Sequence, residues 1–173
     1  MSTTLEDRLS IEKRGMELEY VSIRGEILKR IELRQQIVAV TLTLAGIFLG
    51  IGITTETVAL IYPVLATFLA LGWGQNDFRV RDLATYQREN IESLFPGIKY
   101  ETRIHQNRRM KDGSLGSWRF VVLSHGGIFL LTQFMAIVIE FSKFTFNLLE
   151  YILLGIDVLS MVLVIWVIRQ SKR

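Results

Sequence analysis

The sequence predicts an all-α membrane protein with four transmembrane helices, an N-terminal amphipathic cytoplasmic helix and a small cytoplasmic insert. Three observations predict this fold class. Four apolar runs each approach the roughly 20 residues that a helix needs to cross the hydrocarbon layer. The charged residues, 21% of the chain, gather almost entirely outside those runs. Cysteine is absent and only two histidines occur, so no disulfide framework and no metal site are expected.

The N-terminal segment, residues 1–35, is predicted to form an amphipathic helix. Thr3 and Glu6 fit a capping box at its start. Apolar side chains recur at three-, four- and seven-residue steps and form one stripe. The stripe consists of Leu9, Met16, Tyr20, Ile23, Ile27 and Ile31. Two interpretations are open: the helix lies on the membrane surface or on the protein's own soluble part, or the heptad positions Leu9, Met16 and Ile23 pack against a second copy.

The four apolar runs are predicted to pair as two antiparallel transmembrane hairpins, at residues 36–74 and 120–169. The runs themselves are 37–53, 58–73, 120–139 and 151–168. Small residues recur at four-residue spacing in the first hairpin, which lets helices approach closely in lipid. They are Gly46 and Gly50, extended by Gly52, and then Ala66, Ala70 and Gly74. Such ridges can serve the hairpin itself or contacts between subunits.

The distribution of basic residues predicts the orientation in the membrane. Residues 1–36 carry seven Lys and Arg, residues 74–119 carry nine, and residues 169–173 carry three. The short connections within the hairpins carry none and one, Lys143. By the positive-inside rule, both termini, including the tail at 170–173, and the insert face the cytoplasm. Three tryptophans fall at these cytoplasmic ends, as expected of interface anchors: Trp73, Trp118 and Trp166.

The insert, residues 75–119, divides into three predicted pieces. Helical spacing from Val80 to Leu94, with Asn76 or Asp77 as a cap, predicts a helix that continues the second span. A Phe-Pro-Gly sequence ends this helix. Residues 98–105 alternate apolar and polar side chains, which is typical of a strand. Residues 106–118 are expected to form a loop.

Basic residues make the insert a candidate ligand-binding site. The candidate residues are Arg79, Arg81, Arg88, Arg103, Arg108, Arg109 and Lys111, with His105, Tyr100 and Trp118 nearby. Lys and Arg neutralise phosphates, and aromatic rings can stack on bases. This composition is expected of a site for a nucleotide or single-stranded nucleic acid. It is equally expected of a juxtamembrane segment that touches anionic lipid head groups.

A few polar residues lie at membrane depth in the second hairpin: His125, Thr132, Gln133, Asp157 and Ser160. An ionisable Asp157 near mid-membrane costs roughly 3 kcal/mol or more, so it should face protein or water. One interpretation is structural, with Gln133 or His125 bonded to Asp157. The other makes Asp157, Gln133 and His125 pore-lining or gating groups. In a homo-oligomer, one Asp157 from each subunit would form an acidic ring that favours cations.

Enzymatic chemistry is not expected from this chain. It has no GxSxG, P-loop, HExxH or Rossmann glycine pattern. Ser124 and His125 precede two glycines within the third run, and Ser160 or Asp157 could complete a hydrolase-like set. No nucleophile there has an identifiable base and oxyanion donors, so the glycines are better explained by close packing or a local helix break.

The block at residues 81–101 resembles a juxtamembrane signature of small prokaryotic multi-pass membrane proteins. The matching positions are Tyr86, Arg88, Ile91, Glu92, Pro96, Gly97, Tyr100 and Glu101. The four-span layout is similar to that of membrane effectors of bacterial anti-phage defence, such as the Hailong effector, a tetrameric channel controlled by a single-stranded DNA oligomer. The resemblance implies a homo-oligomer, with a tetramer favoured, in the inner membrane of a prokaryote. It also implies an ion-conducting core, growth arrest on activation and a partner nucleotidyltransferase that makes the signal.

These observations predict a homo-oligomeric transmembrane effector that forms an ion channel or pore, controlled by a nucleotide or single-stranded oligonucleotide signal. The alternative is a non-conducting membrane anchor or interaction protein whose N-terminal helix recruits a soluble partner. Membrane lipid is an expected partner in both cases, and no cofactor is expected.

Overall fold

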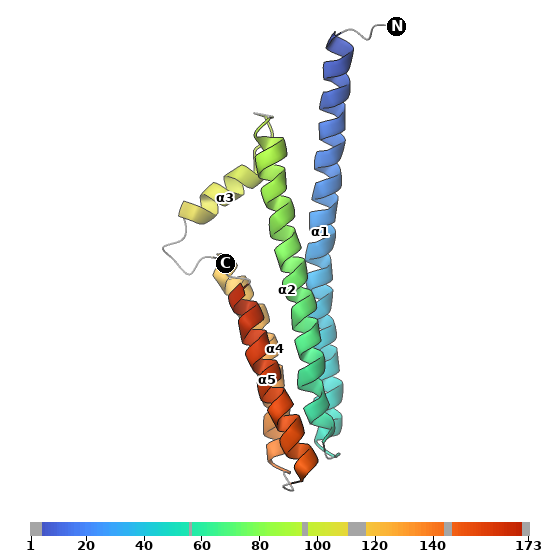
Figure 1. Cartoon of the computed structure of the whole chain (residues 1–173), viewed down its shortest axis with the longest axis vertical. Helices are drawn as coiled ribbons and strands as arrows, with labels where there is room; N and C mark the ends of the chain where they lie inside the picture. Colours follow the sequence, from blue (N-terminus) through green and yellow to red (C-terminus); the bar gives the residue numbers. More distant parts are fainter. Residues whose placement is uncertain (1–4, 56, 95–96, 111–116, 144–146, 171–173) are drawn as a thin grey trace.

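The computed structural model describes residues 5–55, 57–94, 97–110, 117–143 and 147–170, and within these the chain is helical without any strand (Figure 1). Four long helices run side by side, and a short helix projects from one end. In chain order the elements are α1 (Leu5–Gly52), η1 (Val58–Ile61), α2 (Tyr62–Tyr86), η2 (Gln87–Glu92), α3 (Tyr100–Met110), α4 (Ser117–Phe141) and α5 (Leu148–Gln170).

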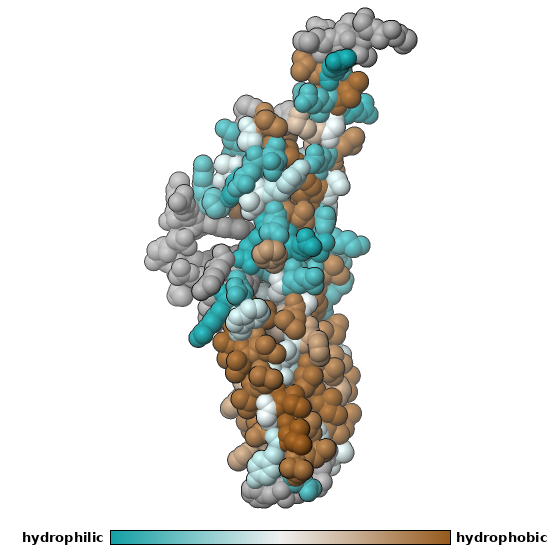
Figure 2. All heavy atoms as spheres, in the orientation of Figure 1, coloured by the Kyte–Doolittle hydropathy of each residue, from teal (hydrophilic) through white to brown (hydrophobic). Residues whose placement is uncertain are grey.

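Four helices are long and apolar enough to cross a membrane, in agreement with the predicted spans. Figure 2 shows the apolar surface as a continuous band over the half of the molecule that contains α4 and α5. The other half, which contains η2, α3 and the first part of α1, is mostly hydrophilic. This division is that of a multi-pass membrane protein, because lipid requires an apolar surface over the depth of its hydrocarbon layer.

Helix α1 corrects the predicted boundary between an N-terminal helix and a first span. It is one continuous helix of 48 residues, which makes it about 72 Å long at 1.5 Å per residue. Neither of the two prolines of the chain lies within it, so nothing removes a backbone hydrogen bond and the helix does not break. The N-terminal half therefore continues the span as an extension of the same helix (Figure 1).

The predicted apolar stripe of α1 packs on the extension of α2. Ile27 is buried, and Met16, Tyr20 and Ile23 are partly buried on the same face. Leu9, the first heptad position, is 57% exposed because α1 extends beyond the end of α2 there (Figure 1). The predicted capping box of Thr3 and Glu6 lies outside the side chains that the structure describes.

The four long helices share one core in the membrane half. Val38, Ala70, Trp73, Phe129 and Val164 form a buried apolar cluster to which α1, α2, α4 and α5 all contribute. The two small-residue ridges of the first hairpin differ in use. Ala66 and Ala70 are buried within the bundle, and a Cβ on Gly74 would lie 2.7 Å from Val167. By contrast, a Cβ on Gly46 or Gly50 would meet nothing within 4 Å.

Polar contacts hold the turns at the far end of the membrane half. The backbone N–H of Thr57 donates to Glu140 Oε1 at 2.7 Å. Lys143 Nζ donates to the carbonyl of Gly52 at 2.6 Å, which caps the end of α1. A Cβ on Gly52 would lie 2.7 Å from Ala59 Cβ, so the close turn requires glycine. These contacts fasten the α4–α5 turn to the α1–α2 turn.

The described part of the insert is helical except at residues 93–94 and 97–99, between η2 and α3. Helix α2 and the π-helical turn η2 continue the second span to Glu92, which confirms the predicted extension. The strand predicted at 98–105 is wrong, because α3 begins at Tyr100 and runs to Met110. The predicted loop is wrong at 106–110, which belong to α3, and at 117–118, where α4 begins. A lone strand would leave its backbone groups unpaired, whereas a helix satisfies them internally.

Candidate functional site

Glu92 builds the junction between η2 and α3. Its Oε1 accepts the backbone N–H of Glu101 at 2.8 Å. Its Oε2 accepts the backbone N–H of Thr102 at 2.8 Å and the hydroxyl of Thr102 at 2.7 Å. A carboxylate at a helix N-terminus satisfies free N–H groups and the helix dipole together. The buried side chain of Glu92 therefore starts α3 and fixes it against the end of α2.

A basic groove of about 460 Å³ lies between η2 and α3. It is lined by three cations, two hydroxyl residues, one amide and one carboxylate. These are Arg88, Lys99 and Arg103, then Ser93 and Thr102, then Gln106 and Glu92. The carboxylate of Glu92 already accepts three hydrogen bonds from α3 and Thr102. The hydroxyls of Thr102 and Ser93 donate to Glu92 and to the carbonyl of Glu89, so the groove presents its three cations, the groups that bind phosphate.

Two of the predicted ligand residues, Arg88 and Arg103, meet in this groove. Arg88 also pairs with its exposed neighbour Glu89 at 2.8 Å. Lys99 was missed, because the strand interpretation of 98–105 gave it no geometric relation to Arg103. In the structure the backbone N–H of Arg103 donates to the carbonyl of Lys99 at 3.0 Å, so the two lie one helical turn apart. The four-residue spacing between Lys99 and Arg103, which places both on one side of a helix, could have identified Lys99 as a groove residue.

The other predicted basic residues lie elsewhere. Arg79 is exposed on α2, and Arg81 pairs with Asp77 at 3.6 Å. His105 is exposed on α3 and does not line the groove. The side chains of Arg108, Arg109, Lys111 and Trp118 lie outside the described part of the chain.

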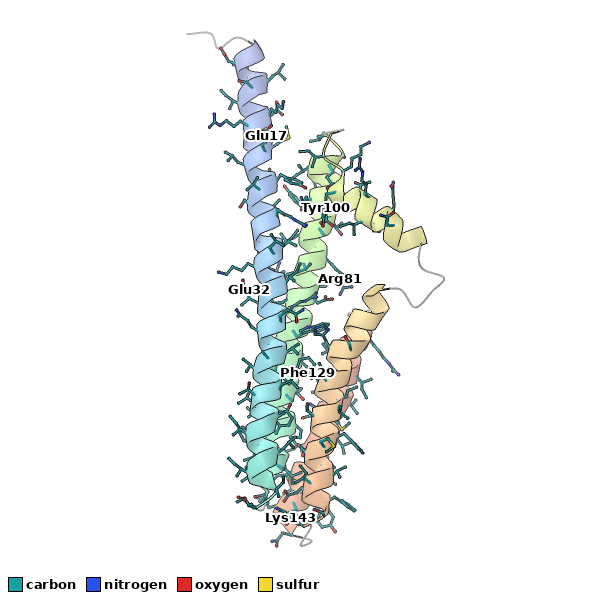
Figure 3. All side chains as sticks on the ribbon, turned by 180° about the vertical axis from the view of Figure 1, so that it is seen from behind. Glu17, Glu32, Arg81, Tyr100, Phe129 and Lys143 are labelled. Carbon is teal, nitrogen blue, oxygen red and sulfur yellow. The ribbon has the colours of Figure 1, made fainter. Side chains whose placement is uncertain are left out.

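Contacts from the insert reach α1 and fix the groove to the long helix. Arg24 donates to Glu101 Oε1 at 2.9 Å, and its guanidinium lies 4.4 Å from the centre of the Tyr100 ring (Figure 3). Tyr86 donates its hydroxyl to Glu19 at 2.7 Å. The extension of α1, the end of α2 and the start of α3 thus form one connected unit outside the apolar band.

The residues of block 81–101 that resemble a known signature have structural partners here. Ile91 is buried, Glu92 caps α3, and Tyr86, Tyr100 and Glu101 contact α1. Holding these helices together is a sufficient physical reason for those residue types. Pro96 lies outside the described residues, and Gly97 is exposed.

A charged cluster lies where the extension of α1 and α2 meets the apolar band. Asp77, almost completely buried, accepts a hydrogen bond from Arg34 and pairs with Arg81. Arg34 also lies over the Trp73 ring, 5.5 Å from its centre, and the ring of His125 stacks on Trp73 at 5.7 Å. Trp73 is 1% exposed, so the prediction that it anchors the protein in the lipid interface is wrong. Trp166, at 55% exposed, is available for that role.

Polar side chains also meet inside the membrane half. Gln133 Nε2 donates to the carbonyl of Pro63 and to Thr67 Oγ1, both at 3.0 Å. Thr67 Oγ1 lies 3.4 Å from the carbonyl oxygen of Ser160. Tyr62 donates its hydroxyl to Thr132 at 2.8 Å. Helices α2, α4 and α5 are therefore joined by a polar layer within the protomer.

Asp157 lies on the buried face of α5, one turn before Ser160, and is completely buried. Within the described structure, neither carboxylate oxygen has a hydrogen-bond partner, and neither do Gln133 Oε1 and Glu140 Oε2. Neither Gln133 nor His125 bonds to Asp157, which differs from the structural interpretation of the sequence. Asp157 faces the interior of the protomer, and the acidic ring between subunits stays a prediction.

Thr67 and Glu140 belong to this polar layer and were missed, because Thr67 is a common residue in a span and Glu140 falls at the end of one. The described residues contain no cluster of histidine, cysteine or carboxylate side chains that could hold a metal ion. The chain matches no known protein family, no curated protein and no solved structure.

Proposed function

We propose that this protein is a homo-oligomeric transmembrane effector that senses a phosphate-rich cytoplasmic signal and controls an ion path through its helices. The signal is a nucleotide or a single-stranded oligonucleotide, supplied by a partner nucleotidyltransferase. The resemblance of block 81–101 to small prokaryotic membrane proteins supports a role in anti-phage defence at the inner membrane.

The observation that carries the proposal is the groove between η2 and α3. Arg88, Lys99 and Arg103 bring three positive charges to one groove, and its carboxylate, Glu92, is occupied by α3. A bound phosphate would contact α3 and the end of α2 together. Since α2 continues directly into the membrane half, binding would act on a transmembrane helix without an intervening linker.

The polar layer inside the protomer supports an ion path. Buried oxygens of Asp157, Gln133 and Glu140 have no hydrogen-bond partner in the described chain, whereas Trp73 Nε1, nearer the hydrophilic half, is a buried donor without one. Oxygen acceptors at membrane depth favour cations and hydrogen-bond donors and disfavour anions. We therefore place the path along α4 and α5 within each protomer, with Asp157 and Gln133 as its polar groups. His125, stacked on Trp73, lies beside the charged cluster that contains Arg34 and Asp77.

The test compares the wild-type protein with a variant that carries Arg88→Gln and Arg103→Gln. We expect weaker binding of a fluorescent single-stranded oligonucleotide and a salt dependence of log K reduced by up to about 1 for each lost phosphate contact. Arg79→Gln, an exposed cation outside the groove, is the matched control and should behave nearly as wild type. Equal affinity and salt dependence in the double variant would remove the groove from the proposal.

The same proteins, reconstituted in planar bilayers, test the ion path. Conductance that depends on the oligonucleotide in the wild type and is lost in the double variant is the expected result. If the wild-type protein binds the oligonucleotide but never conducts ions, the channel function is refuted and only the sensing of the oligonucleotide stands.

The second candidate function is a non-conducting anchor that recruits a soluble partner. It is favoured by the first turns of α1, which extend beyond the rest of the molecule and expose Leu9 and Ile11 (Figure 1). A stable soluble partner in pull-downs, lost on Leu9→Ser with Ile11→Ser and accompanied by a monomer in detergent, would support this function over the first.

A further inference from the structure

Helix α1 has a second apolar stripe, opposite to the one that packs on α2. Ile11, Leu18, Val21 and Leu28 are 66%, 65%, 67% and 54% exposed. Their spacing of seven, three and seven residues is that of the a and d positions of a coiled coil. They lie in the hydrophilic half of the molecule, where lipid does not cover them (Figure 2). Glu32 follows Leu28 by four residues and so lies on the same side of α1.

The same face continues into the membrane half as a ridge of small residues. On a helix with 3.6 residues per turn, the exposed stripe, Gly25, Thr43, Gly46 and Gly50 all project within about 50° of one direction. Ile27, Val38 and Ala45 are buried on the opposite side. A Cβ added at Gly25, Gly46 or Gly50 would meet nothing within 4 Å, so this ridge is not used inside the protomer.

We propose that this face of α1 binds the same face of α1 in a second copy of the chain, as a parallel pair related by a twofold axis along the membrane normal. This inference specifies the homo-oligomer of the proposed function and rests on that part of it. The heptad register suggested by the sequence, through Leu9, Met16 and Ile23, is replaced by one through Ile11, Leu18, Val21 and Leu28.

A second copy is the best occupant because one part of this face lies beside water and the other part lies beside lipid. The occupant must be compatible with water beside Leu28 and with lipid beside Gly46, and the change must fall at the same level on both partners. A second copy placed by an axis along the membrane normal meets this condition at every level. Lipid alone would leave the stripe from Ile11 to Leu28 uncovered, and a soluble partner would leave Gly46 and Gly50 uncovered.

The size and charge of the face are sufficient for a stable pair. From Ile11 to Gly50 the face is about 60 Å long, and a helix is about 10 Å wide, so a pair buries roughly 1,200 Å² in total. That is above the roughly 1,000 Å² expected of a specific interface. Arg14 lies one turn from Glu17, and Lys29 one turn from Glu32, so each of these charges has an opposite charge beside it on its own helix.

One such face gives a closed dimer, because a twofold contact uses the same surface on both copies. A tetramer would need a second contact elsewhere. In the membrane half the axis of the α1 pair is lined by Thr43, Gly46 and Gly50, which offer no charged group to an ion, so an ion path would not lie on it.

The test uses the absence of cysteine from the chain. Leu18→Cys and Leu28→Cys are introduced singly, and the membranes are treated with a mild oxidant. We expect disulfide-linked dimers on non-reducing gels. Glu12→Cys and Glu26→Cys are matched controls, since both are exposed at similar levels on other sides of α1 and should stay monomeric. Equal cross-linking at the control positions would overturn the proposed face.

A second variant addresses the membrane half of the pair. Gly46→Leu with Gly50→Leu, added to Leu18→Cys, leaves the protomer intact because the added side chains enter open space. We expect loss of the cross-link and a monomer mass in native mass spectrometry. Ile51→Phe, at an exposed residue that projects about 100° or more away from both glycines on α1, should change neither. Cross-linking that survives the glycine substitutions would also overturn the proposal.

The outcomes separate this inference from the proposed function. A dimer that cross-links only at the control positions would refute the proposed α1 face but would agree with the proposed homo-oligomer. A wild-type monomer in native membranes removes both the face and the homo-oligomer. Oligonucleotide binding in the groove is measured independently of either result.

Discussion

The carboxylate of Glu92 has two effects on the insert. It starts α3 by accepting two backbone N–H groups, and it lines the groove beside the cations of Arg88, Lys99 and Arg103. Its negative charge offsets part of the positive charge of these cations. One side chain therefore determines both the position of α3 and the charge of the candidate site.

Replacing Glu92 tests this at the scale of a residue. Glu92→Ala removes three hydrogen bonds at the start of α3, a loss of about 1–2 kcal/mol for a helix cap. We expect faster amide hydrogen exchange across residues 99–107, measured by mass spectrometry in detergent. Glu89→Ala, which removes an exposed carboxylate nearby, is the control and should leave exchange in α3 unchanged. Unchanged exchange in Glu92→Ala would show that α3 does not depend on this cap.

Helices α1 and α2 are joined along their whole shared length by contacts of different kinds. Apolar packing around Val38 and Ala70 joins them in the membrane half, and the pair of Arg34 with Asp77 joins them where the apolar band ends. Arg30 adds a hydrogen bond to Asn76 at 3.3 Å. Beyond these, Tyr86 reaches Glu19. The two helices therefore form a single element that crosses from the apolar to the hydrophilic half.

The element-scale prediction concerns the buried ion pair. Asp77→Ala leaves the side chain of Arg34, 12% exposed, without its carboxylate, which costs about 3 kcal/mol when one partner of a buried pair is removed. We expect a lower thermal unfolding midpoint in detergent. Asp82→Ala removes an exposed carboxylate five residues away on the same helix and should have little effect. Equal midpoints for the two variants would mean that the pair does not stabilise the hairpin.

At the scale of the molecule, the four spans were predictable because long apolar runs and clustered charges are properties of segments. The extension of α2 was predictable for the same reason. The unbroken α1 was not, because a change of composition near residue 36 resembles a boundary although nothing there breaks a helix. The prediction of a strand at 98–105 was wrong because the alternation of apolar and polar side chains over eight residues carries no information about Glu92, which caps a helix that begins at Tyr100. The position of Lys99 in the groove depends on this local cap, whereas the burial of Asp157 within one protomer depends on contacts between segments far apart in the chain.

The orientation of the molecule in the membrane gives a prediction that uses the cysteine-free sequence. Ser10→Cys lies on the hydrophilic extension of α1, and Ser142→Cys lies at the opposite end, after α4. By the positive-inside rule, a membrane-impermeant thiol reagent should label Ser142→Cys in intact bacterial cells with a permeabilised outer membrane. It should label Ser10→Cys only after the inner membrane is opened. Labelling of Ser10→Cys in intact cells would reverse the orientation.

The unbroken length of α1 has a mechanical consequence. Because α1, about 72 Å long, is joined to α2 along their shared length, the two helices tilt together as a lever arm, and a tilt of about 5° at their turn moves the far end of α1 by about 6 Å. Arg24 ties this lever to Glu101 at the base of α3, close to the groove. A displacement of a few tenths of an ångström between helices in the membrane half would thus become a larger displacement at the cytoplasmic tip. A small force applied at the tip would, conversely, exert a larger force on the membrane half.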